Sequence, residues 1–338
     1  ALRVEVSSDP RALGVIRGVL QVWLGLVGLP ASDIRFVLSQ LTAGTGGSSS
    51  EWQSYVTRDS GGIADAQATT ETATAGTFVD NNDGTYTYTF ASALTDYPAG
   101  PTFDAAKTHR IGIEIRGQAP ISSNGILTFV PAGGDPVTER RIVDNDTCNA
   151  CHDRLEFHGG PRTDVDYCVT CHNPYSIDGD TGNTVDMKAL IHNIHAGRDG
   201  YVIIGFGGTV HDYSDIVWTQ DVRNCQTCHE EDDANTPQAS NWRLVQNVES
   251  CGTCHDDIDF AAGGHPGGIN DNSICAQCHG PDSQVGGGNR FIGGRGGAGG
   301  RLGGLLRETV EQLLDLAAEG LRGTFEMAVQ GRRRFLQA

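Results

Sequence analysis

The feature that most constrains this 338-residue chain is the pattern C-x-x-C-H, which occurs five times between residues 148 and 279. The copies are CNACH, CVTCH, CQTCH, CGTCH and CAQCH, and they use all ten cysteines: Cys148, Cys151, Cys168, Cys171, Cys225, Cys228, Cys251, Cys254, Cys275 and Cys278. Two thiols three positions apart can add to the two vinyl groups of one haem, while the next histidine reaches its iron. The pattern therefore predicts five covalently attached c-type haems.

Two other uses of paired cysteines fit this chain less well. Zinc ribbons use C-x-x-C pairs in twos and need no following histidine, so five pairs would leave one over. A thioredoxin-like redox motif occurs singly in a βαβ context, which is absent here. Five haems would share roughly 26 residues each, so we expect the porphyrins to pack against one another and supply most of the apolar core.

The histidine count matches this prediction. Five of the 11 histidines belong to the motifs and are the expected proximal ligands: His152, His172, His229, His255 and His279. Five more lie among the motifs and are the expected distal ligands: His158, His192, His195, His211 and His265. The last, His109, is in phase with upstream strand residues and is predicted to be a hydrogen-bonded histidine of the β-domain.

The only methionines, Met187 and Met327, are predicted to pack rather than to bind iron. Bis-histidine ligation of all five irons follows, giving low-spin, low-potential haems without a vacant site. That ligation favours an electron carrier over a catalyst.

The segment IHNIH places His192 and His195 three positions apart on a predicted helix. This spacing separates two side chains by about 60° around the axis and about 4.5 Å along it. Both cannot bind one iron from opposite sides, so we expect them to serve two neighbouring haems; a polar helix face or half of a zinc site is the alternative. His158 follows His152 by only six residues and should also ligate another haem than the one His152 binds.

The region before the first motif contains no cysteine and has the alternation of half-buried β-strands. Ile34, Phe36 and Leu38 share one strand face. Ile111, Ile113 and Ile115 share another, with Arg110, Glu114 and Arg116 opposite. In NNDGTYTYTF, Asp83 and Gly84 are predicted to form a hairpin turn ahead of Tyr86, Tyr88 and Phe90. A β-sandwich or split barrel is therefore expected, followed by a haem-cored, mostly irregular domain with short helices.

These patterns divide the chain into a β-domain over residues 1–142, a pentahaem domain over 143–283, a Gly/Arg-rich linker over 284–304 and an amphipathic helical tail over 305–338. The apolar run at 13–29 contains Arg17 and Gln21 and is too short for a membrane span, so a buried strand or helix is expected, with a retained signal segment as the alternative. We also expect an export leader to have been cleaved or omitted before Ala1.

Charge and composition narrow the partners further. The net charge of −18, from 42 acidic and 24 basic residues, disfavours nucleic acid.

In DGDTGN, the side chains of Asp178, Asp180 and Asn183 suggest a calcium ion, although the segment lacks a complete EF-hand loop and a plain turn is favoured.

The motifs and their surroundings resemble one protein family. The stretches NDTCNACHDRLEFHGGPR, DYCVTCHNP, MKALIHNIHAG, VHDYSDIVWTQDVRNCQTCHEE, CGTCHDDIDF and GGHPGG are similar to the outer-membrane decahaem cytochromes of the OmcA/MtrC type, as are ASDIRF and NDGTYTYTF upstream. The resemblance covers about residues 27–283, equivalent to one β-domain plus one pentahaem half; residues 1–26 fit poorly and 284–338 match nothing familiar. It implies electron transfer from the outer membrane to external acceptors or partner cytochromes, and it gives the same five distal histidines.

The expected function is therefore to pass single electrons outside the cytoplasm, at the cell surface or outer membrane, with the periplasm as an alternative. One rival is a subunit of a cytochrome filament, joined to its copies through the C-terminal tail. The other is a multihaem reductase of oxyanions, which needs a five-coordinate haem.

Overall fold

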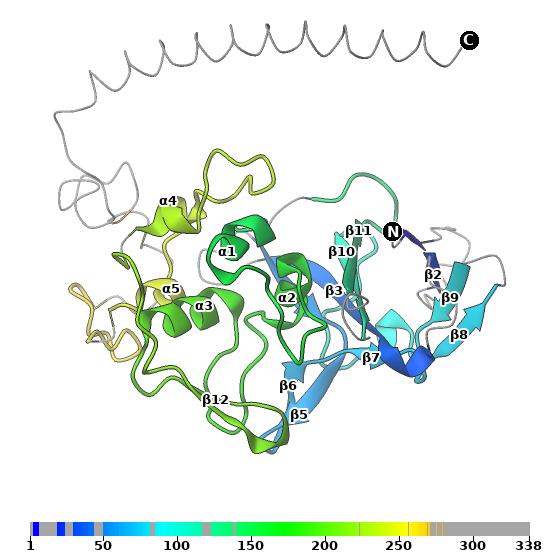
Figure 1. Cartoon of the computed structure of the whole chain (residues 1–338), viewed down its shortest axis with the longest axis horizontal. Coiled ribbons are helices and arrows are strands. Elements are labelled where there is room, and N and C mark those ends of the chain that lie inside the picture. Colours follow the sequence, from blue (N-terminus) through cyan, green and yellow to red (C-terminus); the bar gives the residue numbers. More distant parts are fainter. Residues whose placement is uncertain are drawn as a thin grey trace, which may run out of the picture. The chain divides into compact units, whose positions relative to one another are not determined.

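The computed structural model describes residues 3–6, 19–23, 30–43, 50–81, 85–116, 123–137, 140–222, 224–255, 257–268, 270, 275 and 279 (Figure 1). The predicted turn at Asp83 and Gly84, Cys278, the linker over 284–304 and the helical tail over 305–338 lie outside the described residues.

Two antiparallel sheets form the β-domain (Figure 1). One contains β1 (Arg3–Val6), β2 (Val19–Trp23), β9 (Thr85–Thr89) and β8 (Thr77–Asp80) in that order. The other contains β11 (Ser123–Phe129), β10 (His109–Ile115), β3 (Ile34–Ala43) and β4 (Ser50–Ser54), with β7 (Glu71–Thr72) also paired to β3. A separate hairpin joins β5 (Thr57–Ser60) to β6 (Ile63–Ala68), and short 3₁₀ turns span Ala31–Asp33 and Leu94–Asp96.

The predicted apolar faces meet between the two sheets. Alternate residues of β3, β9 and β10 are buried there together, and the ring of Phe36 stacks on that of Tyr88 with 4.1 Å between centroids. The antiparallel pairing of β8 with β9 confirms the predicted hairpin. Among the described strands the sheets do not close into a barrel, which agrees with the expected β-sandwich or split barrel.

One expectation about β10 is wrong, because the strand is buried on both faces rather than on one. Arg110 is 3% exposed and Glu114 0% exposed. The second face is covered by α2 (Val165–Cys171), the helix of the CVTCH motif. A Cβ at Gly112 would lie 2.7 Å from the Tyr167 ring, so only glycine at this position lets helix and sheet approach so closely.

The motif region after the sheets is mostly irregular, with short helices and one small hairpin (Figure 1). Its other helices are α1 (Asn145–His152), α3 (Met187–Ala196), α4 (Asn241–Leu244) and α5 (Val248–Cys251), with 3₁₀ turns at Phe206–Gly208 and Cys225–Thr227. The hairpin pairs β12 (Val202–Ile204) with β13 (Val210–Asp212). Among the described residues no helix is both long and apolar enough to cross a membrane.

Candidate haem-binding site

Helix capping places three of the motifs at the ends of short helices. The side chains of Asp144, Asp164 and Asn247 each accept a backbone N–H in the first turn of α1, α2 and α5. In α1 and α2 both cysteines lie in the last turns of the helix. His152 ends α1, and His172 immediately follows α2.

The structure brings four proximal histidines next to four distal ones. The ring centroids of His152 and His195 are 5.9 Å apart, as are those of His172 and His158. Two further pairs are His229 with His192 at 6.3 Å, and His279 with His265 at 5.9 Å.

These separations fit an iron between each pair of rings. Imidazole nitrogens bind first-row metals at about 2 Å, and the ring centre lies about 1 Å further on, so two trans imidazoles have centres about 6 Å apart. Two stacked rings in direct contact would be closer and parallel, whereas these pairs have interplanar angles of 34° to 82°. The described residues therefore fit the predicted haem group.

Hydrogen bonds orient several of these rings. His172 Nδ1 lies 2.9 Å from the carbonyl of Val185, and His195 Nδ1 lies 2.9 Å from that of Ile191. A proton on Nδ1 donated to these carbonyls leaves Nε2 as the iron ligand. Desolvation lowers the pKa of His158 to about 3 and that of His229 to about 4, which favours the neutral form that binds metal.

A tight turn explains why His158 meets His172 rather than His152. His158 has a φ of 56°, and Gly159 and Gly160 follow with φ of 84° and 104°. The backbone of Phe157 pairs with that of Arg162 across this turn, which directs the chain back towards α2.

Helix α3 holds the two histidines of IHNIH against different partners. His192 lies beside His229, while His195 lies beside His152. This is the arrangement expected from their spacing. The indole of Trp218 packs edge-on against His195 at 5.0 Å.

Two predicted ligands are not brought together. His211 lies in β13 and stacks on Tyr213, with 6.4 Å between ring centroids, and His255 follows α5 without a described ring partner. Among the described residues these are the only proximal and distal candidates left over.

His109 is the hydrogen-bonded β-domain histidine that the sequence predicted. Its ring is buried, with Nε2 2.9 Å from the Tyr55 hydroxyl and Nδ1 2.9 Å from the Lys107 carbonyl. Both nitrogens are occupied, so neither is free for iron.

The segment DGDTGN, for which a plain turn was favoured over a calcium site, forms a closed turn. Asp178 is fully buried, and its carboxylate accepts from the Thr181 hydroxyl at 2.7 Å and from the backbone N–H groups of Ile204 at 2.8 Å and Asp180 at 3.2 Å. The Asn183 amide donates to the Val202 carbonyl at 2.8 Å. These contacts give Asp178 a structural role in the turn.

Cysteines of different motifs influence one another electrostatically. Burial raises the pKa of each thiol, and a cysteine of another motif adds to the rise: Cys148 for Cys168, Cys228 for Cys148, Cys254 for Cys225 and Cys275 for Cys251. Desolvation raises the pKa of Cys148 to about 11 and that of Cys168 to about 12, unlike the low-pKa thiols of redox enzymes.

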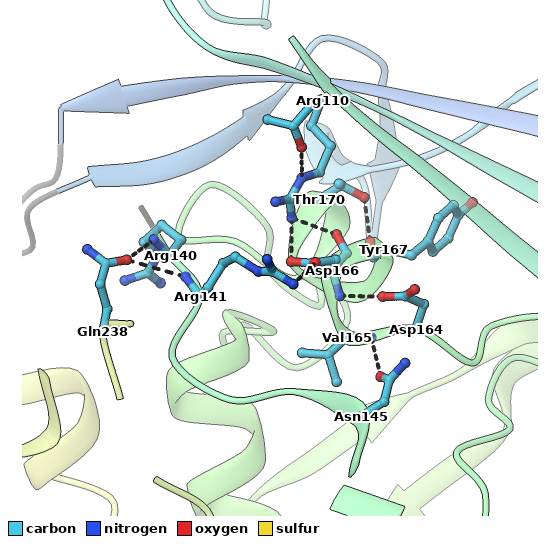
Figure 2. A network of polar contacts seen from close by, with 11 residues as sticks. Arg110, Arg140, Arg141, Asn145, Asp164, Val165, Asp166, Tyr167, Thr170 and Gln238 are labelled. Carbon is cyan, nitrogen blue, oxygen red and sulfur yellow. Dashed lines mark hydrogen bonds and ion pairs between the residues drawn. The ribbon is translucent and has the colours of Figure 1, made fainter. Parts of the chain in front are cut away.

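Charged residues at the junction of sheet and motif helices were missed as contributors to the site. Figure 2 shows Arg110 donating to Asp166, which also pairs with Arg141, while Gln238 accepts from the backbone N–H groups of Arg140 and Arg141. Arg110 Nη1 lies 3.0 Å from Asp166 Oδ1, and its guanidinium carbon lies 4.3 Å from the centre of the Trp52 ring. The sequence signal is the alternation of charged residues in HRIGIEIR, a pattern that is also typical of a strand with one solvent-facing side.

Comparisons with known proteins agree with this architecture. Residues 47–136 match a model of the OmcA-like N-terminal domain, and residues 140–288 match one described as outer membrane cytochrome MtrC/MtrF-like, domains II/IV. This chain belongs to the OmcA/MtrC family. The multiheme cytochrome MtrC of Shewanella baltica (strain OS185) is 33% identical over 273 residues, covering 77% of this chain and 36% of the relative.

Two crystal structures of family members have similar folds. The outer membrane decaheme cytochrome OmcA superposes with a TM-score of 0.66 at 24% identity, covering 85% of this chain and 47% of OmcA. MtrC from Shewanella baltica OS185 gives 0.58 at 28% identity, covering 82% and 43%. The chain thus spans less than half the length of each of these relatives.

Proposed function

We propose that this chain carries single electrons through five bis-histidine c-type haems. Once bound at these residues, haem would supply a one-electron couple between ferric and ferrous iron. The observation that supports the proposal best is the set of four imidazole pairs with centroids 5.9–6.3 Å apart, each joining one motif histidine to one histidine outside the motifs.

The same pairs suggest a ligand set for each haem. Four haems would each be held by one of these imidazole pairs: His152 with His195, His172 with His158, His229 with His192, and His279 with His265. By elimination the fifth is His255 with His211. His211 lies in β13, and His255 follows α5. The chain after each element approaches the end of α3, since Gly197 lies close to the Ile216 carbonyl and Arg198 donates to the Gly252 carbonyl at 2.5 Å.

The electrostatic influences between cysteines of different motifs suggest an order of haems that differs from chain order. The motifs are numbered one to five along the sequence. Motif one then neighbours motifs two and three, motif three neighbours motif four, and motif four neighbours motif five. Helix α3 supports the contact between one and three, because its two histidines serve those haems. Motifs two and five would then lie at the two ends of the electron path.

The cellular role follows from the family. We propose export to the cell surface or outer membrane and electron exchange with partner cytochromes or external acceptors. The domain division at residues 142, 283 and 304 and self-association through the tail remain predictions, as does calcium at Asp178, Asp180 and Asn183. A filament subunit is the second candidate, and an oxyanion reductase would need a haem without its distal histidine.

Haem stoichiometry and ligation test the proposal together. Intact mass of the exported protein should show five covalent haems, and electron paramagnetic resonance should show only low-spin ferric iron. Fewer than five haems would contradict the attachment sites. A high-spin signal in the unaltered protein would contradict complete bis-histidine ligation and favour the reductase.

A further inference from the structure

A buried ion pair links the sheet to the turn that presents His158. Glu114 of β10 is fully buried, and its Oε2 accepts from Arg162 Nε at 2.8 Å and from the Tyr167 hydroxyl at 3.0 Å. The Arg162 side chain is 17% exposed and lies over the Tyr167 ring. A second cation, Arg116, pairs with the other carboxylate oxygen from a more exposed position.

This ion pair lies beside one imidazole pair. Arg162 closes the turn that contains His158, and Tyr167 directly precedes Cys168 in α2. The rings of His158 and His172 have centroids 5.9 Å apart. Arg162 is thus joined to the first of these predicted ligands by its turn, and Glu114 is joined through the Tyr167 hydroxyl to the helix that precedes the second. Both charges therefore lie beside the predicted ligands of the second haem.

We propose that Glu114 and Arg162 are positioning residues that set the reduction potential of the haem attached at Cys168 and Cys171. This inference rests on the proposed function. Reduction adds one electron to ferric iron and removes one positive charge, so a nearby cation favours the ferrous state and a nearby anion the ferric state. Because the pair is buried, water and salt screen it weakly. The β-domain thus supplies the anion that balances Arg162 at this haem.

The structure gives the sign of each substitution. Glu114→Gln keeps the side-chain volume but leaves Arg162 uncompensated, so this haem should become easier to reduce. We expect its ferrous-to-ferric ratio at fixed potential to rise about tenfold, equivalent to about 59 mV for one electron. Arg116→Gln removes a cation from the same carboxylate without emptying the buried pair. It should shift the potential of this haem in the opposite direction, by less.

An exposed ion pair in the same segment provides a matched control. Glu156 pairs with Arg154 at 3.3 Å, only two residues before His158, and both side chains are 48% exposed. Glu156→Gln also leaves an arginine uncompensated, but in water. We expect a much smaller change in potential, which disappears in high salt.

The test is a redox titration of the full holoprotein, with each haem followed by the proton resonances of its methyl groups. The second haem is identified by the resonances that change in a His158→Ala variant. The proposal is supported if Glu114→Gln raises the potential of the second haem and of no other haem. This rise must exceed the change caused by Glu156→Gln and must persist at high salt. If Glu114→Gln does not fold, the opposite shift in Arg116→Gln decides.

The outcomes separate this inference from the proposed function. Five attached low-spin haems with an unchanged second potential, or with a shift of the wrong sign, would overturn the inference and leave the proposed function intact. Fewer than five haems in the unaltered protein would contradict the proposed function itself.

Discussion

Lys188 is expected to be a major contributor to stability at the junction between the β-domain and α3. It is one of only two lysines in the chain. Its Nζ lies 3.1 Å from Glu51 Oε1 in β4 and 3.2 Å from Asp186 Oδ2, and the three side chains are 12%, 0% and 3% exposed. Lys188→Met keeps most of the apolar stem but leaves two buried carboxylates without this cation.

The expected loss is large for one substitution. Breaking a buried ion pair by removing one partner costs about 3–5 kcal/mol, because the other charge stays buried. Glu51 and Asp186 are both almost inaccessible to water, so the upper half of that range is expected at neutral pH. The exposed pair of Arg154 with Glu156 is the control, and Arg154→Met should cost about 1 kcal/mol or less.

The loss should depend on pH in a defined direction. Burial raises the pKa of Asp186, and Lys188 opposes that rise, so removing the lysine raises the pKa further. A carboxyl whose pKa is higher in the folded state than in the unfolded state destabilises the fold when ionised, and this penalty disappears as pH falls through the folded pKa. Lys188→Met should therefore cost less near pH 5 than near pH 7.

Guanidinium chloride unfolding of the holoprotein, followed by circular dichroism in the Soret band, measures both effects. Glu51→Gln in the Lys188→Met background should recover part of the loss, since one unpaired charge is then removed. A cost no greater than that of Arg154→Met, or the same cost at both pH values, would refute the reasoning.

Three further outcomes are expected. His192→Ala and His195→Ala should each keep five attached haems and make one of them high-spin, and electron paramagnetic resonance should show that the two affected haems differ. Tyr55→Phe removes the hydroxyl that contacts His109 Nε2 and should cost about 1 kcal/mol in thermal unfolding without changing the haem spectra. If hydrogen bonds alone hold the turn, Asp178→Asn should lower the thermal midpoint equally in the presence of calcium and of a chelator. A bound calcium ion would instead make the thermal midpoint of the unaltered protein depend on calcium.

The β-domain was largely predictable because alternation along a strand records which side chains are buried together. Ile34 and Phe36 of β3 and Tyr88 of β9 lie in one core as their spacing indicated. The second face of the main sheet was not predictable. Arg110 and Glu114 have the composition of a solvated face, and only the packing of α2 makes them buried ion pairs. The alternation of residues along a strand contains no information about a helix that lies later in the chain.

The site was predictable in its chemistry and not in its pairing. The motifs predict the attachment cysteines and proximal histidines, and counting predicts the distal candidates. Which imidazole faces which depends on contacts between distant segments, such as His152 with His195. Only the spacing within α3, and the short distance from His152 to His158, constrained the pairing from the sequence.

The proposed order of haems has a consequence for the role of the sheet. If the second motif is one end of the electron path, it is also the motif whose helix packs on β10 and whose ligand turn contacts Glu114 through Arg162. The potential of a terminal haem decides how readily electrons enter or leave at that end, whereas a change at an inner haem alters only passage between its neighbours. The buried charges of the sheet would then lie where they bias exchange with an outside partner. Glu114→Gln should then change the rate of electron exchange at the haem of the second motif and leave the rate at the haem of the fifth motif unaltered. Stopped-flow oxidation by acceptors directed to one end or the other would measure the two rates separately. Equal changes at both ends would contradict the proposed order.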